Sequence, residues 1–197
     1  MKKKILIILI AFIVIIGIYG VFHFNQHNDE LIENTNTLNE DEVSSINLEE
    51  LINNVYSNVP EGTLPNLQTV KVELNDLDIV EYETGLKSVE NIEEIYKSDM
   101  MSSQAYSFIV VKTKNISDAE KVQTEMVNNI DPRKWICVCA EKIYSISKDN
   151  VVALVMSNEE WGKPVFEAIK KELDGGKELQ MTVEEDISSN MPGAIVE

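Results

Sequence analysis

The chain has 197 residues, of which 34 are Asp or Glu and 17 are Lys or Arg, so its formal net charge is −17. This length accommodates one ordinary domain with appendages. An apolar content of 44% excludes a chain that is disordered throughout. Such an acidic chain also lacks the clustered basic side chains that a phosphate backbone requires, so we expect no nucleic-acid partner.

The N-terminus has the pattern of a membrane-spanning helix. Three lysines at positions 2–4 precede an apolar run over residues 5–24. Twenty helical residues reach roughly 30 Å, which is the thickness of the hydrocarbon core of a bilayer. Lysines precede the run and acids follow it, so the positive-inside rule places the N-terminus in the cytoplasm and the remainder outside the cell.

A cleaved signal peptide is the alternative interpretation of this segment. The apolar core of a signal peptide is usually only about 7–15 residues long and ends at a small-x-small site. The run here is longer, residues 17–28 contain no such site, and no cysteine follows closely for lipid attachment. We therefore predict that residues 1–24 are an uncleaved single-pass anchor in the cell membrane, with the lysines on the cytoplasmic side.

Composition divides the rest of the chain into three parts. Residues 25–46 are rich in Asn, Thr, Ser and acids, so they cannot bury enough surface to offset chain entropy and are predicted to be an acidic flexible spacer. Residues 47–175 are predicted to form a folded extracellular domain. Residues 176–197, which include Pro192 and Gly193, are predicted to be a disordered tail.

Three segments of the domain have the periodicity of amphipathic helices. The first begins at Leu48, with Asn47 as its N-cap. The other two open with a Ser-x-x-Glu sequence, which is the pattern of a capping box. The second helix is predicted to begin at Ser117, with Glu120 completing the box, and to end near Asn129. The third is predicted to begin at Ser157, with Glu160 completing the box and Pro164 in the first turn, and to end at Gly175.

Two hairpins are predicted between these helices. Residues 94–101 pair with residues 105–113, and residues 143–147 pair with residues 151–156 through a Lys-Asp-Asn turn. The run from Phe108 to Val111 is apolar on both faces, as in an inner strand.

The remaining segments before these hairpins have weaker patterns. Residues 70–74 alternate like a short strand, and residues 77–88 read as loop. The order of elements indicates an α+β fold, with an antiparallel sheet of about four strands and helices packed on one face, preceded by one transmembrane helix.

Four short segments carry a family resemblance: YETGL at 82–86, MMSSQAYSFIVV at 100–111, the helix at 118–127 and KDNVVALVM at 148–156. In these segments the chain resembles a family of small extracytoplasmic domains of unknown function in Gram-positive bacteria, which are lipoproteins or membrane-anchored proteins. The chain departs from that pattern by lacking a lipobox cysteine, by a short connection at residues 128–135 and by Val151 in place of an aromatic residue. The resemblance implies an envelope location but no activity, so it transfers no functional residue.

Cys137 and Cys139 are the chemically most distinctive residues. If residues 135–140 form a strand, the two cysteines face the same way with Cα atoms roughly 6.6–6.8 Å apart, at the upper limit of about 6.8 Å for a disulfide. A bridge would be strained and easily reduced, which makes the pair redox candidates. Their neighbours are apolar, however, so we favour two buried free thiols in the core.

No other pattern indicates a catalytic or metal site. The only histidines, His23 and His27, lie at the membrane boundary, which leaves no histidine base in the globular region for a Ser or Cys nucleophile. The acids around Asp76 and Asp78 lack the spacing of a calcium loop. Trp135 and Trp161 are candidate partner contacts, although each also suits an edge of the core. We therefore predict no catalytic residue, no cofactor and no metal.

These features together favour a non-catalytic binding or accessory module at the cell envelope. Its expected partners are the membrane, through the N-terminal helix, and an envelope protein. Two alternatives stay open. One is a thiol-active accessory protein that uses Cys137 and Cys139, and the other is an envelope hydrolase whose carboxylates the sequence does not identify.

Overall fold

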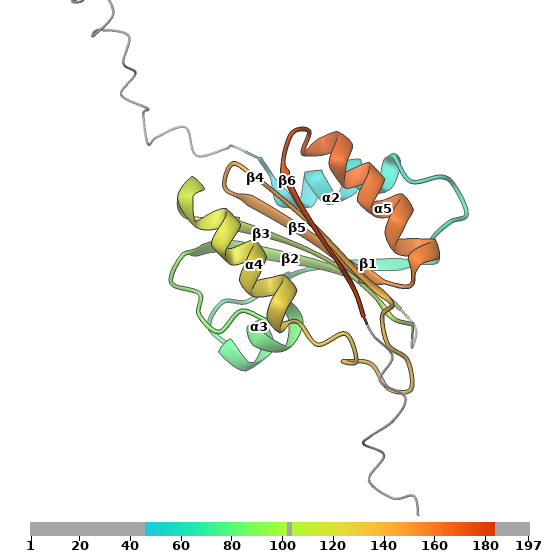
Figure 1. The fold of residues 1–197 in the computed structure, drawn as a ribbon, viewed down its shortest axis with the longest axis horizontal. Helices are drawn as coiled ribbons and strands as arrows, with labels where there is room; N and C mark the ends of the chain where they lie inside the picture. Colours follow the sequence, from blue (N-terminus) through green and yellow to red (C-terminus); the bar gives the residue numbers. More distant parts are fainter. Residues whose placement is uncertain (1–45, 102–103, 184–197) are drawn as a thin grey trace, which may run out of the picture. The chain divides into compact units, whose positions relative to one another are not determined.

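The computed structural model of the chain describes residues 46–101 and 104–183. They form an α+β domain in which a six-stranded antiparallel sheet lies between two layers of helices (Figure 1). The predicted α+β class and both predicted hairpins are confirmed. The sheet has two strands more than expected, and helices cover both of its faces.

The elements are named by their order along the chain. The helices are α2 (Leu48–Ser57), α3 (Leu77–Thr84), α4 (Ala119–Asn129), which follows the 3-10 turn η1 (Ile116–Asp118), and α5 (Glu159–Glu172). The strands are β1 (Leu67–Val72), β2 (Ile92–Met100), β3 (Tyr106–Thr113), β4 (Lys142–Lys148), β5 (Val151–Ser157) and β6 (Lys177–Thr182). Their order across the sheet is β1-β2-β3-β5-β4-β6, and all neighbours are antiparallel.

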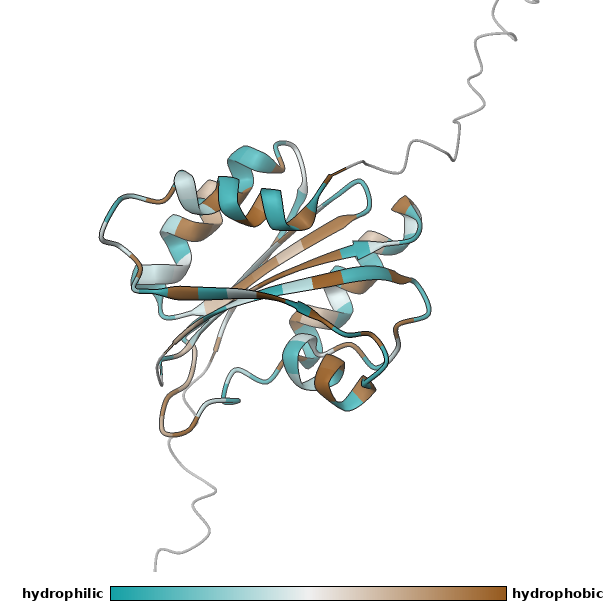
Figure 2. Cartoon of the chain, turned by 180° about the vertical axis from the view of Figure 1, so that it is seen from behind, coloured by the Kyte–Doolittle hydropathy of each residue, from teal (hydrophilic) through white to brown (hydrophobic). Residues whose placement is uncertain are grey.

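The two central strands explain why helices cover both faces of the sheet. Every residue of β3 and of β5 is buried. Phe108 and Val110 pack in the cluster that includes α2 and α5, whereas Ile109 and Val111 pack in the cluster that includes α4. Figure 2 shows the apolar residues along these strands. The prediction of helices on one face is therefore wrong, because a strand that is apolar on both sides needs a cover on each.

The two edge strands account for the larger sheet. β1 pairs along β2, from Leu67 opposite Met100 to Val72 opposite Ile95. β6 pairs with β4, so residues 177–182 form a strand and not the start of a disordered tail. The long-range contacts that hold β6 have no local signal, since most of its residues are exposed. Residues 184–197 of the predicted tail lie outside the described residues.

A buried glutamine joins β6 to the rest of the domain. The Gln123 side chain of α4 donates through Nε2 to the carbonyl oxygen of Lys177 at 2.9 Å. Its Oε1 accepts from the Ser147 hydroxyl of β4 at 2.8 Å. Because Gln123 is fully buried, both bonds satisfy groups that would otherwise be costly to bury. They fix the start of β6 beside β4.

The predicted N-cap residue is confirmed for α2, whereas the N-cap of α5 lies one residue after the predicted one. Asn47 accepts from the backbone N–H of Glu50 at 3.0 Å, as predicted. At α5 the cap is Asn158, which accepts from the N–H of Trp161 at 2.9 Å, because Ser157 is still the last residue of β5. Pro164 consequently lies in the second turn and not in the first.

The capping box predicted for α4 is not formed. Ser117 lies in η1, and Asp118 stands at the N-cap position without a side-chain bond to the backbone. The Glu120 carboxylate instead pairs with the Lys177 ammonium group at 2.5 Å. A contact with β6 therefore replaces the local capping interaction.

Residues 77–84, predicted as loop, form α3. Asp76 caps its start by accepting from the N–H of Ile79 at 3.2 Å. Gly85 ends it in a left-handed conformation, with φ 77°. A Cβ at Gly85 would lie only 2.5 Å from the backbone nitrogen of Ile130, so this glycine lets α3 approach the end of α4.

Among the residues that the structure describes, no helix is both long and apolar enough to cross a membrane. The predicted anchor, residues 1–24, and the predicted spacer up to residue 45 lie outside the described part of the chain.

Replacing Gly85 tests the contact between α3 and α4. Gly85→Ala and Gly62→Ala each place a Cβ on a left-handed residue, which costs about 1 kcal/mol. Only the Cβ at Gly85 meets backbone atoms, whereas nothing lies within 4 Å at Gly62. We expect Gly85→Ala to lower the free energy of unfolding by about 2 kcal/mol more than Gly62→Ala, measured by urea unfolding of the full chain in detergent. Equal losses would show that α3 does not need this approach.

Candidate functional site

The connection between α4 and β4 forms a closed loop at one end of the sheet. We call residues 131–140 the Cys-Val-Cys loop. The N–H of Ala140 donates to the carbonyl oxygen of Pro132 at 2.9 Å, which closes the loop at its base. Asp131 Oδ1 accepts from the N–H of Arg133 at 2.8 Å. These bonds make the segment a compact loop of the kind that often carries function.

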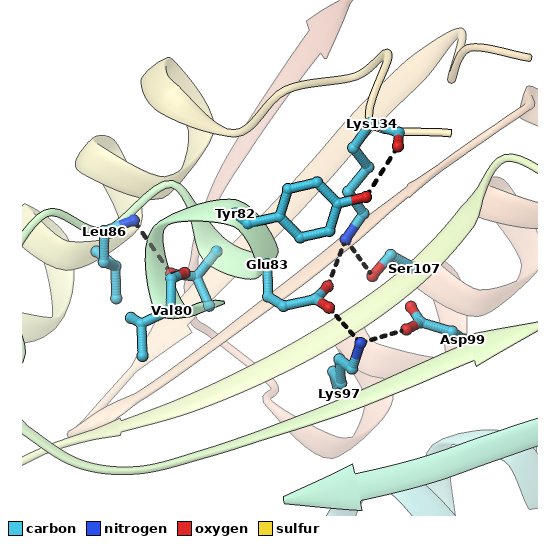
Figure 3. Close-up of polar contacts among 9 residues, drawn as sticks. Val80, Tyr82, Glu83, Leu86, Lys97, Asp99, Ser107 and Lys134 are labelled. Carbon is cyan, nitrogen blue, oxygen red and sulfur yellow. Dashed lines mark hydrogen bonds and ion pairs between the residues drawn. The ribbon is translucent and has the colours of Figure 1, made fainter. Parts of the chain in front are cut away.

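Lys134 is the charged residue of this loop whose side chain points inward. Its side chain is only 3% exposed, and its Nζ lies 2.8 Å from the Glu83 carboxylate of α3. The same Nζ lies 3.4 Å from the Ser107 hydroxyl at the start of β3. Figure 3 shows the lysine reaching from the loop to the helix and the sheet. One side chain therefore links three segments that are distant in sequence.

The ion pair extends to β2. Lys97 contacts the second oxygen of the Glu83 carboxylate, and it lies 2.9 Å from Asp99 Oδ2. We call these four residues, Glu83, Lys97, Asp99 and Lys134, the Glu83 cluster (Figure 3). Two lysines and two carboxylates balance in charge, so this part of the interior contributes nothing to the negative net charge of the chain.

Burial and hydrogen bonding act against each other on Lys97. Burial lowers the pKa of its ammonium group, but hydrogen bonds to Glu83 and Asp99 outweigh burial and leave the pKa above its usual value. Lys97 is therefore protonated at neutral pH. Asp99 has one further feature, because its Oδ1 is buried without a hydrogen-bond partner among the described residues.

Two aromatic rings enclose Lys134. Its Nζ lies 5.6 Å from the ring centre of Tyr82 and 5.4 Å from that of Trp135, within the range of cation–π attraction. The Tyr82 hydroxyl also donates to the carbonyl oxygen of Lys134 at 2.9 Å. Tyr82 thus holds the backbone of the loop while half of its own side chain stays in solvent.

The two cysteines are exposed and unbridged. The preferred prediction of buried free thiols is wrong, because both side chains are exposed. Residues 135–140 also form no strand, and Cys137 has a left-handed backbone with φ 64°. Ile136, counted as a core neighbour, is 85% exposed. Ala140 is buried and Trp135 and Val138 are partly buried against the core, so the loop turns these apolar residues inward while both thiols face solvent.

Trp135 and Trp161, the two candidate partner contacts, are partly buried against the two cores. Within residues 46–101 and 104–183, no three His, Cys, Asp or Glu side chains meet in a way that could hold a metal ion. Ser102, Ser103, His23 and His27 lie outside the described residues.

A separate hollow of about 320 Å³ lies beside the connection from α2 to β1. Tyr56, Pro60, Leu64 and Pro65 line it. Burial raises the pKa of Tyr56 to about 12, and its hydroxyl pairs with that of Tyr106 at 3.1 Å. The lining is mainly apolar, and it brings no group that points to a reaction.

Sequence reasoning missed Glu83 and Lys134. Glu83 lay in a segment predicted mostly as loop, and Lys134 lay in the connection that precedes the possible strand at residues 135–140. Lys134 follows Arg133 in the sequence, so no local pattern distinguished the buried lysine from an exposed basic neighbour.

The chain matches no protein-family model, no curated protein and no solved structure. The resemblance described from the sequence therefore stays a prediction.

Removing Lys134 tests whether the Glu83 cluster holds the domain together. Lys134→Met leaves part of a buried carboxylate without its partner, so we expect the free energy of unfolding to fall by about 3 kcal/mol. Lys71→Met is the matched control, because Lys71 pairs with Glu94 on the surface with half of its side chain exposed. That change should cost less than about 1 kcal/mol. Urea unfolding of the full chain measures both, and similar losses would contradict a buried network.

Proposed function

We propose that this chain is a single-pass membrane protein whose α+β domain binds a protein partner outside the cell without catalysing a reaction. The apolar run over residues 5–24, the lysines before it and the acids after it support the anchor and its orientation. The predicted spacer places the domain at a distance from the bilayer.

The Cys-Val-Cys loop and α3 supply the contact surface in this proposal. Ile79, Tyr82 and Ile136 are 49%, 54% and 85% exposed. Tyr82 is attached to the loop through its hydroxyl, and the Glu83 cluster holds both segments. A rigid aromatic residue next to exposed aliphatic ones is the composition that interface centres favour, since little ordering entropy is lost on binding. The exposed apolar side chains on α3 and on the loop, two segments joined by the Tyr82 hydrogen bond and the Glu83 cluster, are the observation that carries the proposal.

The charges around this surface suggest the chemistry of the partner. Asp78 and Glu81 lie on the exposed side of α3, and Asp131 lies at the base of the loop, all of them in solvent. Arg133 of the loop is exposed as well, so three carboxylates against one guanidinium leave the rim net acidic. An apolar centre with an acidic rim complements a protein segment with apolar contact residues flanked by Lys or Arg. Glu83, the most buried carboxylate, is engaged by two ammonium groups, which suits a structural role better than proton transfer.

A photo-reactive residue at position 136 of the full-length protein would crosslink to the partner in cells. Mass spectrometry of the crosslinked product then identifies the partner. The affinity of that partner is then measured for variants in detergent. Ile136→Asp should weaken binding at least tenfold, as expected for a central contact. Ile116→Asp should leave binding unchanged, because Ile116 is also exposed but follows the opposite end of β3.

Equal effects of the two substitutions would contradict a contact surface on the loop. Reproducible turnover of an envelope substrate, abolished by a point mutation, would contradict the non-catalytic part of the proposal.

A thiol-active accessory role is the second candidate, and the exposure of both cysteines favours it. In the bridged form, a thiolate of a partner dithiol would attack one sulfur of the pair and form a mixed disulfide. The second partner thiol would then displace the loop, leaving the partner oxidised and both cysteines as free thiols. Strain in a bridge between residues i and i+2 would drive the exchange in this direction.

The reduction potential of the pair tests this role. We expect both thiols to remain free in a glutathione buffer near −230 mV, in which a structural disulfide with a potential below about −300 mV is fully oxidised. Differential alkylation of the folded full chain measures the oxidised fraction, and Cys139→Ser serves as the unbridgeable control. A fully bridged pair in that buffer would eliminate the role of disulfide donor.

A further inference from the structure

We infer that Cys137 and Cys139 together bind one Cu(I) ion as a two-sulfur site on the Cys-Val-Cys loop. This inference is independent of the proposed partner binding, because it uses the thiols and not the apolar surface. It also differs from thiol exchange, in which the sulfurs bond to each other or to a partner sulfur.

The spacing of the two residues suits a metal bridge better than a disulfide. Cys137 stands in a bend with a left-handed backbone, whereas Val138 between the two cysteines carries neither turn nor bend. The upper limit for the separation of the cysteine Cα atoms is therefore that of extended chain, roughly 6.6–6.8 Å. A sulfur–sulfur bond of about 2.05 Å is at its limit across that distance. Two metal–sulfur bonds of about 2.3 Å each allow the sulfurs to stand up to about 4.6 Å apart. The metal therefore relieves the strain that a bridge would create.

The number and type of ligand atoms determine which metal the site can bind. Thiolates are soft ligands that prefer Cu(I), zinc and iron–sulfur clusters. Zinc and iron–sulfur clusters require about four protein ligands in structural sites, but no third His, Cys, Asp or Glu joins the pair among the described residues. Cu(I) has a filled d shell and is stable with two sulfur ligands in a linear arrangement. Of these three, a two-thiol site therefore fits Cu(I).

The loop is prepared to hold the two sulfurs in place. Its base is closed by the bond from Ala140 to Pro132, and the buried Lys134 fixes its other side against Glu83. Both thiols remain open to solvent, so an ion can reach them without unfolding the loop.

Competition with a chelator tests the site. The reduced full chain, in detergent and without oxygen, is titrated into the coloured Cu(I) complex of bicinchoninate, and loss of the colour reports transfer. We expect one Cu(I) per chain, with an affinity that falls at least about a hundredfold in Cys137→Ser and in Cys139→Ser. Met101→Leu is the matched control, because it removes another exposed sulfur, 71% exposed, and should change nothing.

Two further measurements complete the test. X-ray absorption of the loaded protein should show two sulfur neighbours around the copper, and the same chain should take no Zn(II) from a zinc chelator under these conditions. Circular dichroism checks that the serine variants are folded. The inference is overturned if no copper leaves bicinchoninate, if Cys139→Ser takes copper as well as the original chain, or if nitrogen and oxygen replace sulfur around the metal. None of these results depends on the binding assay with Ile136→Asp.

Discussion

The carboxylate of Glu83 joins helix α3, strand β2 and the Cys-Val-Cys loop at one end of the domain. It brings an ammonium group from β2 and another from the Cys-Val-Cys loop to one helix, α3, and each of these contacts is largely removed from water. Buried charges stabilise a fold only when every one of them has partners, since desolvation is otherwise too costly. The positions of helix, strand and loop therefore depend on one another, and a substitution that displaces one of them removes an ion-pair partner from the others.

The architecture of the sheet explains why that junction exists. β3 and β5 are apolar on both sides, so one helical layer cannot cover them. α4 covers the second face, and the chain must then return from the end of α4 to the far side of β5, where β4 lies. The returning segment is the Cys-Val-Cys loop, which passes the start of β3 and meets Ser107 there. The position of the cysteines is thus a consequence of sheet order.

Local sequence patterns predicted the parts of the fold that local interactions determine. Apolar periodicity identified α2, α4 and α5, and apolar segments on either side of a short turn identified both central hairpins, because these signals arise within a dozen residues. β6 depends on Gln123, more than fifty residues away, and α3 depends on contacts of Glu83 with two other segments. The burial of the thiols was mispredicted for a similar reason, since apolar neighbours suggested a core, whereas the loop turns Trp135, Val138 and Ala140 inward and leaves both thiols in solvent.

The two chemical roles proposed for the thiols exclude each other at any moment. A disulfide removes both ligands of a metal, and a bound Cu(I) occupies both sulfurs that exchange would need. The spacing of residues i and i+2 weakens the disulfide but not the metal bridge, so the loop biases the pair toward the reduced form. The ion pair between Lys134 and Glu83 bears on the thiols although it touches neither, by limiting how far the backbone around them can move.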